Sequence, residues 1–158
     1  MFGAIGEDCN VMSRIVPLYP ELIKLGNNVR LASKVTFVTH DVSHVMLNAH
    51  SALRGERFSE KIGCIEIQDN VFVGAGTTIL YGVRIGSNVI VGAGSLINKD
   101  IPSNSVVAGV PARVIESFDD YLAKRRSEQG LPDELLPAGE SLCQQAVDMC
   151  WNDFYRDH

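Results

Sequence analysis

One histidine stands where it could act as an acid–base catalyst. His40 lies in the run Val-Thr-His-Asp, residues 38–41. A hydroxyl group is a weak nucleophile, and a base that removes its proton accelerates its attack on a carbonyl group. Histidine is the side chain whose ordinary pKa suits this work near neutral pH. Asp41 could orient the ring, but neighbouring residues on a strand point to opposite faces, so we do not expect the two side chains to touch.

Two basic residues stand alone in a long stretch of the chain. Lys99 and Arg113 are the only basic residues between Arg84 and Lys124, and Arg113 ends the run Gly109–Arg113. Lysine offers a point charge to an anionic group, and arginine offers a fork of donors. The sequence contains no glycine-rich phosphate loop and no nicotinamide-binding fingerprint.

A six-residue period organises the middle of the chain and must position these side chains. It runs without interruption from Ile67 to Pro102 as IQDNVF VGAGTT ILYGVR IGSNVI VGAGSL INKDIP. The first place in each six is aliphatic, and these residues are Ile67, Val73, Ile79, Ile85, Val91 and Ile97. The fifth place is small or β-branched, and these residues are Val71, Thr77, Val83, Val89, Ser95 and Ile101. Ordinary strands alternate with a period of two, so this pattern instead predicts stacked coils of a parallel β-helix, with strands about 4.8 Å apart.

The period also extends toward the N-terminus, with two interruptions. Sixes begin at Ile5 and Val11 and resume at Leu25, which is two residues out of phase, so we expect about two residues to bulge out near Tyr19–Ile23. The period is then lost over the polar stretch 43–64, which we expect to form a loop extruded from the helix. A long loop on a rigid scaffold is a usual place for binding residues.

The C-terminal part of the chain is predicted to be helical. Ser117 followed by Asp119-Asp120 is typical of a helix start, with an N-cap and acidic residues at the positive end of the helix dipole. A second helix, with apolar residues on one stripe, is predicted from Ser141 onward. We therefore divide the chain into a β-helix domain, residues 1–115, and a C-terminal helical extension, residues 116–158.

Over roughly Ile5 to Ile115 the chain resembles the hexapeptide-repeat acyltransferases, and it is most similar to their maltose/galactoside and capsular-sugar O-acetyltransferase branch. The resemblance implies an all-β fold, a left-handed parallel β-helix, although right-handed crossovers are the general rule. It also implies an enzyme that moves an acetyl group from acetyl-CoA to a hydroxyl, or an amine, of a sugar or other small acceptor. No metal is needed for that reaction. The family's homotrimer, with each active site shared between two chains, is implied as well.

The resemblance also assigns roles to particular residues. Thr-His at the end of an upstream coil, before an extruded loop and the long repeat, resembles the family's catalytic motif and implies that His40 is the general base. In this family the pantetheine arm of the donor lies along the prism against small residues at coil corners. Ala75 in VGAGTT and Ala93 in VGAGSL match such positions.

Two further motifs match the nucleotide end of the donor. Asn98-Lys99 stands where the family commonly has Thr-Lys, so the resemblance implies that Lys99 pairs with a phosphate. Residues 109–113 resemble the family's Gly-Asn-Pro-Ala-Arg/Lys motif, which implies that Arg113 reaches the 3′-phosphate or the adenine region. Asn98 in place of threonine and Val110 in place of asparagine are the departures from the pattern.

Two other functions fit parts of the sequence. His40, His44 and His50 equal in number the zinc ligands of γ-class carbonic anhydrases, which are also left-handed β-helix trimers. Stoichiometric zinc in the purified protein would indicate that class. A non-catalytic β-helix scaffold subunit would keep the repeat but would have no need of Thr-His together with Lys99 and Arg113. Failure to bind acetyl-CoA would indicate a scaffold.

The composition fits a single globular domain. The chain has 158 residues, 46% hydrophobic and 21% charged, with a net charge of -5 and no basic cluster, which disfavours a nucleic-acid partner. We expect no leader peptide and no membrane span. The four cysteines show no metal-binding spacing, and we interpret them as reduced structural thiols, which fits a cytoplasmic location.

Overall fold

The first of the chain's two compact units is a β-helix, in which each turn of the chain, called a coil, stacks on the one before it. The computed structural model describes residues 1–12, 17–128, 130–137, 139 and 141–157, and the chain divides into units Met1–Leu122 and Ala123–His158. In the first unit Ile65 pairs with Val83, and Val71 pairs with Val89, so one coil consists of three sixes.

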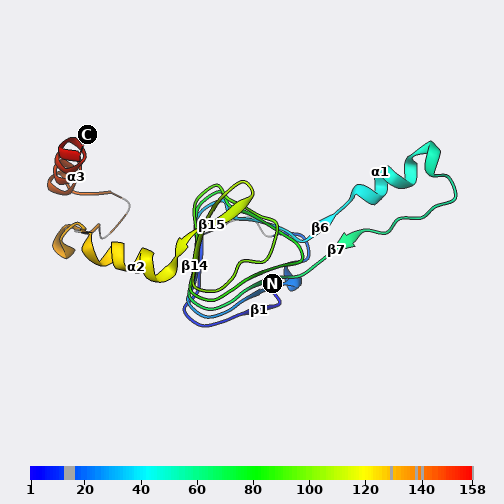
Figure 1. Ribbon diagram of the computed structural model, residues 1–158, viewed down its shortest axis with the longest axis horizontal. Coiled ribbons are helices and arrows are strands. Elements are labelled where there is room, and N and C mark those ends of the chain that lie inside the picture. Colours follow the sequence, from blue (N-terminus) through cyan, green and yellow to red (C-terminus); the bar gives the residue numbers. More distant parts are fainter. Residues whose placement is uncertain (13–16, 129, 138, 140, 158) are drawn as a thin grey trace. The chain divides into compact units, whose positions relative to one another are not determined.

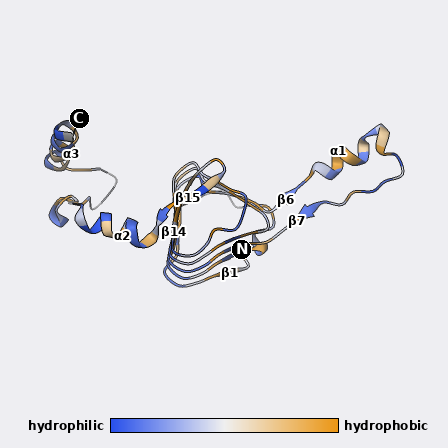
Figure 2. Ribbon diagram, in the orientation of Figure 1, coloured by the Kyte–Doolittle hydropathy of each residue, from blue (hydrophilic) through white to orange (hydrophobic). Residues whose placement is uncertain are grey.

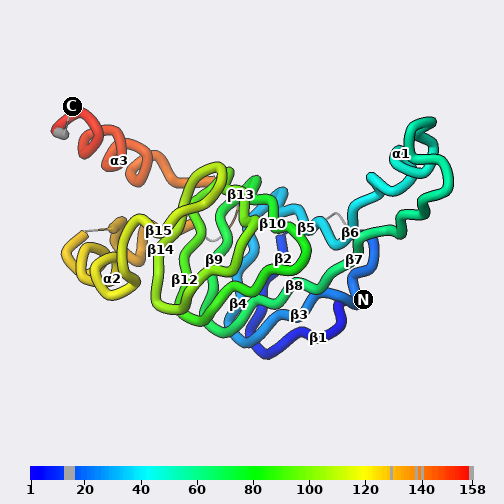
Figure 3. The backbone as a smooth tube through the Cα atoms, turned by 45° about the vertical axis from the view of Figure 1, so that its right-hand side comes forward, coloured from blue at the N-terminus to red at the C-terminus, as the bar shows by residue number. Residues whose placement is uncertain are grey.

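Successive strands lie in three parallel sheets, so the chain winds around a three-sided prism (Figures 1 and 3). Sheet A contains β1 (Ala4–Ile5), β3 (Ile23–Leu25), β8 (Ile65–Ile67) and β11 (Val83–Ile85). Sheet B contains the parallel strands β2 (Asn10–Val11), β4 (Val29–Leu31), β9 (Val71–Val73), β12 (Val89–Val91) and β14 (Ser105–Gly109), and β15 (Ala112–Ser117) joins its end antiparallel. Sheet C contains β5 (Thr36–Val38), β10 (Thr78–Leu80) and β13 (Leu96–Ile97). We name the outer faces A, B and C after their sheets, and the edges after the faces that they separate.

The predicted inward ladders are confirmed. All first-place and fifth-place residues from Ile67 to Ile101 are buried, with at most 8% of the surface of any one exposed. Parallel pairing places equivalent residues of successive coils above one another, as where Ile79 pairs with Ile97. Burying one such aliphatic side chain contributes about 1.5–3 kcal/mol. The prism interior is therefore the core of the fold.

A ladder of asparagines holds the A–B edge. Its four members are Asn28, Asn70, Asn88 and Asn104. Each has a φ in the left-handed region, between 52° and 60°. Asparagine tolerates this conformation better than most side chains do. Each of the first three donates its amide N–H to the amide oxygen of the next, at 2.9, 3.1 and 2.9 Å. The ladder thus satisfies polar groups at a corner where the backbone leaves its strands.

The extruded segment is more ordered than the predicted loop 43–64. It leaves the prism at β6 (His40–Asp41), passes through α1 (Ser43–Ala49) and η2 (Ser51–Leu53), and returns at β7 (Lys61–Ile62), antiparallel to β6 (Figures 1 and 2). The side chain of Asn48 makes two 2.9 Å hydrogen bonds with the backbone of Phe58, which fold the segment back. Because these bonds follow no repeat, the sequence period does not reveal them. We call residues 40–62 the arm.

Two more predicted features of the first unit can be located in the structure. The extra residues expected near Tyr19–Ile23 form η1 (Pro20–Leu22), while Ile23 is fully buried and starts β3. The predicted domain boundary after residue 115 falls inside β15 (Ala112–Ser117), which forms an antiparallel hairpin with β14.

The helical part begins where the sequence predicts and continues with one shift. The hydroxyl of Ser117 accepts the N–H of Asp120 at 3.1 Å and starts α2 (Phe118–Ser127). The second predicted helix begins three residues after Ser141, as α3 (Gln144–Asp157), because the carbonyl of Cys143 accepts the first helical N–H. Between them lies η3 (Asp133–Leu135). Among the described residues, no helix has the length and apolar character needed to cross a lipid bilayer.

We expect the asparagine ladder to contribute measurably to stability. Asn88→Gly keeps the left-handed backbone but removes two amide hydrogen bonds, and should destabilise by about 1 kcal/mol. Asn88→Ala adds the cost of a left-handed alanine and should destabilise by about 2 kcal/mol. Chemical denaturation measures both. Equal stability of the two variants and the wild type would show that the ladder contributes nothing.

Candidate functional site

The C–A edge carries the predicted base and the predicted lysine. Val38 pairs with Leu80, and Ile79 pairs with Ile97, so the residues that follow these strands lie above one another on successive coils. His40 follows β5, and Lys99 follows β13 two coils later. Two coil spacings amount to about 10 Å along the prism. The fold therefore places both residues on one edge, although the whole arm and several strands separate them in the sequence.

The B–C edge carries the two predicted alanines. The N–H of Gly94 donates to the carbonyl of Ala75 at 2.8 Å, which stacks the Ala93 corner on the Ala75 corner. The neighbouring glycines are required by the fold: a Cβ on Gly74 would lie 2.5 Å from the nitrogen of Ala93, and Gly76 has a φ of 71°. Ala75 and Ala93 are exposed, so the fold of one chain does not require them to be small.

These two edges border the same face. Face C lies between them, and its strands are two or three residues long, so the edges are about 10 Å apart. The side chains on face C are mainly apolar or hydroxylated, and they are Thr36, Val38, Thr78, Leu80, Leu96 and Asn98. Five of the six predicted site residues thus surround or lie on one face, and these are His40, Ala75, Ala93, Asn98 and Lys99.

The sixth residue, Arg113, shares a pocket with Lys99. The pocket has a volume of about 320 Å³ and is lined by residues 97–102 and 112–114. Arg113 comes from β15 and donates from its guanidinium to the carbonyl of Ala112 at 2.8 Å. In the described part of the chain, neither Lys99 nor Arg113 forms an ion pair. Asp100 also lines the pocket, and its carboxylate accepts the backbone N–H of Arg84 at 2.8 Å. Two free cations therefore meet in one hollow.

His40 is half-buried and is held from one side. Its Nδ1 is buried and has no hydrogen-bond partner among the described residues. The ring of Tyr19 meets the imidazole edge-to-face, with centroids 5.5 Å apart and planes at 80°. Thr39, the buried residue before His40, donates its hydroxyl to the carbonyl of Leu18. Because Nδ1 is enclosed, Nε2 is the nitrogen that can meet a substrate.

Asp41 serves the arm and not the imidazole. Its carboxylate accepts the backbone N–H of Ser43 at 2.7 Å and the hydroxyl of Tyr81 at 3.5 Å. The hydrogen bond from the backbone of Ser43 is the main cause that lowers the pKa of Asp41, followed by the Ser43 side chain and, after them, the charge of Lys61. No hydrogen bond joins Asp41 to His40 within the described residues. Asp41 ties the start of α1 to the neighbouring coil.

The other two histidines of the arm differ in their surroundings. The Nδ1 of His50 accepts the N–H of Ala52 at 3.2 Å and caps η2. His44 lies in the first turn of α1, and its buried Nδ1 has no partner in the described part of the chain. Over the described residues, no three His, Cys, Asp or Glu side chains gather closely enough to hold a metal ion.

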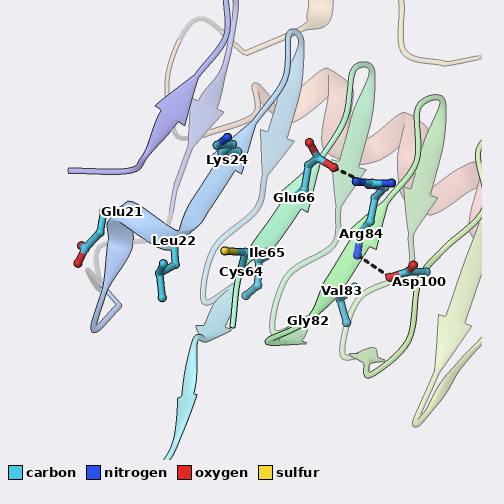
Figure 4. A pocket seen from close by; sticks show the side chains of 10 residues that line it. All are labelled: Glu21, Leu22, Lys24, Cys64, Ile65, Glu66, Gly82, Val83, Arg84 and Asp100. Atoms are coloured by element: carbon cyan, nitrogen blue, oxygen red, sulfur yellow. Dashed lines mark hydrogen bonds and ion pairs between the residues drawn. The ribbon is translucent and has the colours of Figure 1, made fainter. Parts of the chain in front are cut away.

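A larger pocket lies on face A (Figure 4), and it contains none of the predicted site residues but shares Asp100 with the pocket of Lys99 and Arg113. Its volume is about 450 Å³, and Lys24, Glu66 and Arg84 form a ladder of alternating charge across it. Glu66 and Arg84 form an ion pair at 2.5 Å. Because these charges largely compensate one another, we place the chemistry on face C and its edges, where the cations are free.

Two tyrosines of the C–A edge were not predicted as site residues. Tyr81 occupies the same place in its six as Lys99, one coil earlier, so the period contains a signal for it. Tyr19 lies in the segment that is out of phase, and no repeat position marks it. Its place beside His40 emerges only from the folded chain.

Known proteins with similar sequences support this architecture. The family described as "Bacterial transferase hexapeptide (six repeats)" matches residues 65–99. Protein CapG of Staphylococcus aureus is 39% identical over 123 residues, which are 76% of this chain and 69% of that protein. The galactoside O-acetyltransferase of Lactococcus lactis subsp. lactis (strain IL1403) is 41% identical over 100 residues, which are 62% of this chain and 44% of that enzyme.

A solved structure agrees with these relatives. A maltose O-acetyltransferase from Clostridium difficile 630 is 34% identical, with a TM-score of 0.57 over 73% of this chain and 70% of that one. The chain spans less than half the length of the galactoside O-acetyltransferase, but more than two thirds of CapG. Together with the buried hexapeptide ladders, these matches show that the chain belongs to the hexapeptide-repeat acyltransferase family.

Proposed function

We propose that the chain is an acetyl-CoA-dependent O-acetyltransferase that acts on a hydroxyl group of a sugar or similar small acceptor. One observation carries the proposal: His40, Lys99 and the exposed corners Ala75 and Ala93 border one face of the prism, and Arg113 shares a pocket with Lys99. The names of the relatives, galactoside and maltose O-acetyltransferases, support this reaction and this class of acceptor. An amine acceptor would need the same base.

His40 performs the proton transfer in this proposal. The acceptor hydroxyl gives its proton to Nε2 of His40 while its oxygen attacks the thioester carbonyl carbon. The tetrahedral intermediate then collapses, the carbon–sulfur bond breaks, and the departing CoA thiolate takes the proton from the imidazolium. Backbone N–H groups stabilise the oxyanion that forms between these steps. The products are an acetyl ester and free CoA, and no metal takes part.

The donor follows the B–C edge and ends in the pocket of the two cations. A pantetheine arm can approach the backbone closely only where side chains are small. This explains why exposed Ala75 and Ala93 are small, which the fold of one chain does not require. Lys99 and Arg113 then bind phosphate groups of the nucleotide through charge-assisted hydrogen bonds. Asn98, at the end of face C, lies beside the same pocket.

We also propose a left-handed coil and a homotrimer, in which two chains share each site. Face C has partly buried apolar side chains at Val38, Leu80 and Leu96, which suit packing against another copy, and closed symmetry is usual for such contacts. Light scattering tests the trimer, because the mass of a single chain would rule it out. The domain division at residue 115 and a cytoplasmic location remain proposals. Free Cys9, Cys64, Cys143 and Cys150 support that location.

Replacing the base should remove turnover and leave binding intact. His40→Ala should lower kcat by about 100-fold or more, the usual effect of losing a general base, with unchanged acetyl-CoA affinity and unfolding midpoint. His50→Ala is the matched control, because His50 lies in the arm and only caps η2. A thiol-release assay with a panel of sugars measures the rates. More than about a tenth of the wild-type rate in His40→Ala would mean that another group is the base.

Neutralising the pocket should weaken donor binding alone. Arg113→Ala should raise the KM for acetyl-CoA about tenfold, since one charge-assisted contact is lost equally in the ground and transition states. The kcat and the acceptor KM should stay near the wild-type values. Lys24→Ala on face A removes a cation elsewhere and should change none of the three. If Arg113→Ala lowers the melting temperature but leaves CoA affinity intact, the arginine only supports the hairpin.

A further inference from the structure

An aromatic ring lies against the candidate base, and the proposed reaction gives it no role. Tyr19 and His40 meet with ring centroids 5.5 Å apart and planes at 80°. This edge-to-face arrangement is one of the two that aromatic pairs prefer, because the positive edge of one ring meets the negative face of the other. The contact therefore favours one plane for the imidazole over others.

The backbone around Tyr19 is held in an uncommon conformation. Tyr19 has φ 55° and ψ 53°, in the left-handed region that few residues other than glycine adopt. Pro20 follows and disfavours the right-handed helical alternative for Tyr19. Six other non-glycine residues of the described chain have a positive φ, among them Asn28 and Lys34 at coil turns, so this conformation is a constraint of the fold that fixes where the Tyr19 ring lies.

A second contact ties the same two segments together. The hydroxyl of buried Thr39 donates to the carbonyl of Leu18. Thr39, which precedes His40, is thus bonded to Leu18, which precedes Tyr19. Two adjacent contacts, one polar and one aromatic, fix the position of Tyr19 relative to His40.

Among the described residues, no hydrogen bond orients the His40 ring. Its Nδ1 is buried and unpaired within the described residues, and the carboxylate of Asp41 is turned to Ser43 and Tyr81. A catalytic base usually depends on a further group that orients it. Among the described contacts of the His40 ring, the one with Tyr19 can do this.

We propose that Tyr19 is a positioning residue, whose ring, and not its hydroxyl, sets the plane of the His40 imidazole for proton removal from the acceptor. The inference rests on the proposed function, because it needs His40 to be the base. Tyr19 acts through His40 and contacts neither the acceptor nor CoA.

Two substitutions at this position separate the ring from the hydroxyl. Tyr19→Phe keeps the ring and should keep the wild-type kcat. Tyr19→Asn keeps a residue that tolerates the left-handed backbone but removes the ring. It should lower kcat about tenfold or more through misplacement of the base, with both KM values and the unfolding midpoint unchanged. Tyr19→Gly, which adopts this backbone freely, serves as a second ring-free variant should Tyr19→Asn fold poorly.

A double-mutant cycle tests whether the ring acts through the base. Tyr19→Asn should cause no further loss in the His40→Ala background, because the group that it positions is gone. Wild-type kcat in both ring-free variants, an equal loss in the His40→Ala background, or a raised acceptor KM at unchanged kcat would each overturn the inference. If His40→Ala is inactive and Tyr19→Asn is fully active, Tyr19 is not a positioning residue but His40 can still be the base. If His40→Ala is fully active, His40 is not the base and the role of Tyr19 is wrong as well.

Discussion

The structure depends on stacking in register. An aliphatic side chain at every sixth residue cannot be buried by a lone short strand, but it is buried when each coil lies on the next. Since a coil consists of three sixes, as where Ile65 pairs with Val83, a residue's place in its coil fixes the edge or face on which it lies. Residues that are distant in the sequence therefore lie above one another when their separation is a whole number of coils. Tyr81 and Lys99 share an edge because they are one coil apart in the sequence.

The chain turns differently at each of the three edges of the prism. The A–B edge is filled by its asparagine ladder, whose amides bond to one another. On its two later coils the B–C edge turns through glycines and exposes the methyl groups of Ala75 and Ala93, whereas the coil before them exposes Ser33 and Lys34. The C–A edge carries larger polar side chains, among them His40 and Lys99. Face C lies between the B–C edge, with Ala75 and Ala93, and the C–A edge, with His40 and Lys99. For this reason we place the reaction there.

Periodicity determines how much of this could be predicted from the sequence. The buried ladders, both corner alanines and the edge position of Lys99 all follow from the six-residue phase. The helix inside the arm could not be predicted in this way, since the bonds between Asn48 and Phe58 follow no repeat. The pocket that joins Arg113 to Lys99 depends on the turn back of β15, and the contact of Tyr19 depends on an out-of-phase segment. Contacts between non-periodic segments require the folded chain.

A crystal structure of the protein with bound CoA tests the central claim most directly. We predict that the pantetheine arm lies along the B–C edge at Ala75 and Ala93, with the nucleotide phosphates at Lys99 and Arg113. The sulfur should lie within reach of Nε2 of a His40, from the same chain or a neighbouring one. CoA bound in the charged pocket of face A, around Glu66 and Arg84, with face C unoccupied, would contradict the account.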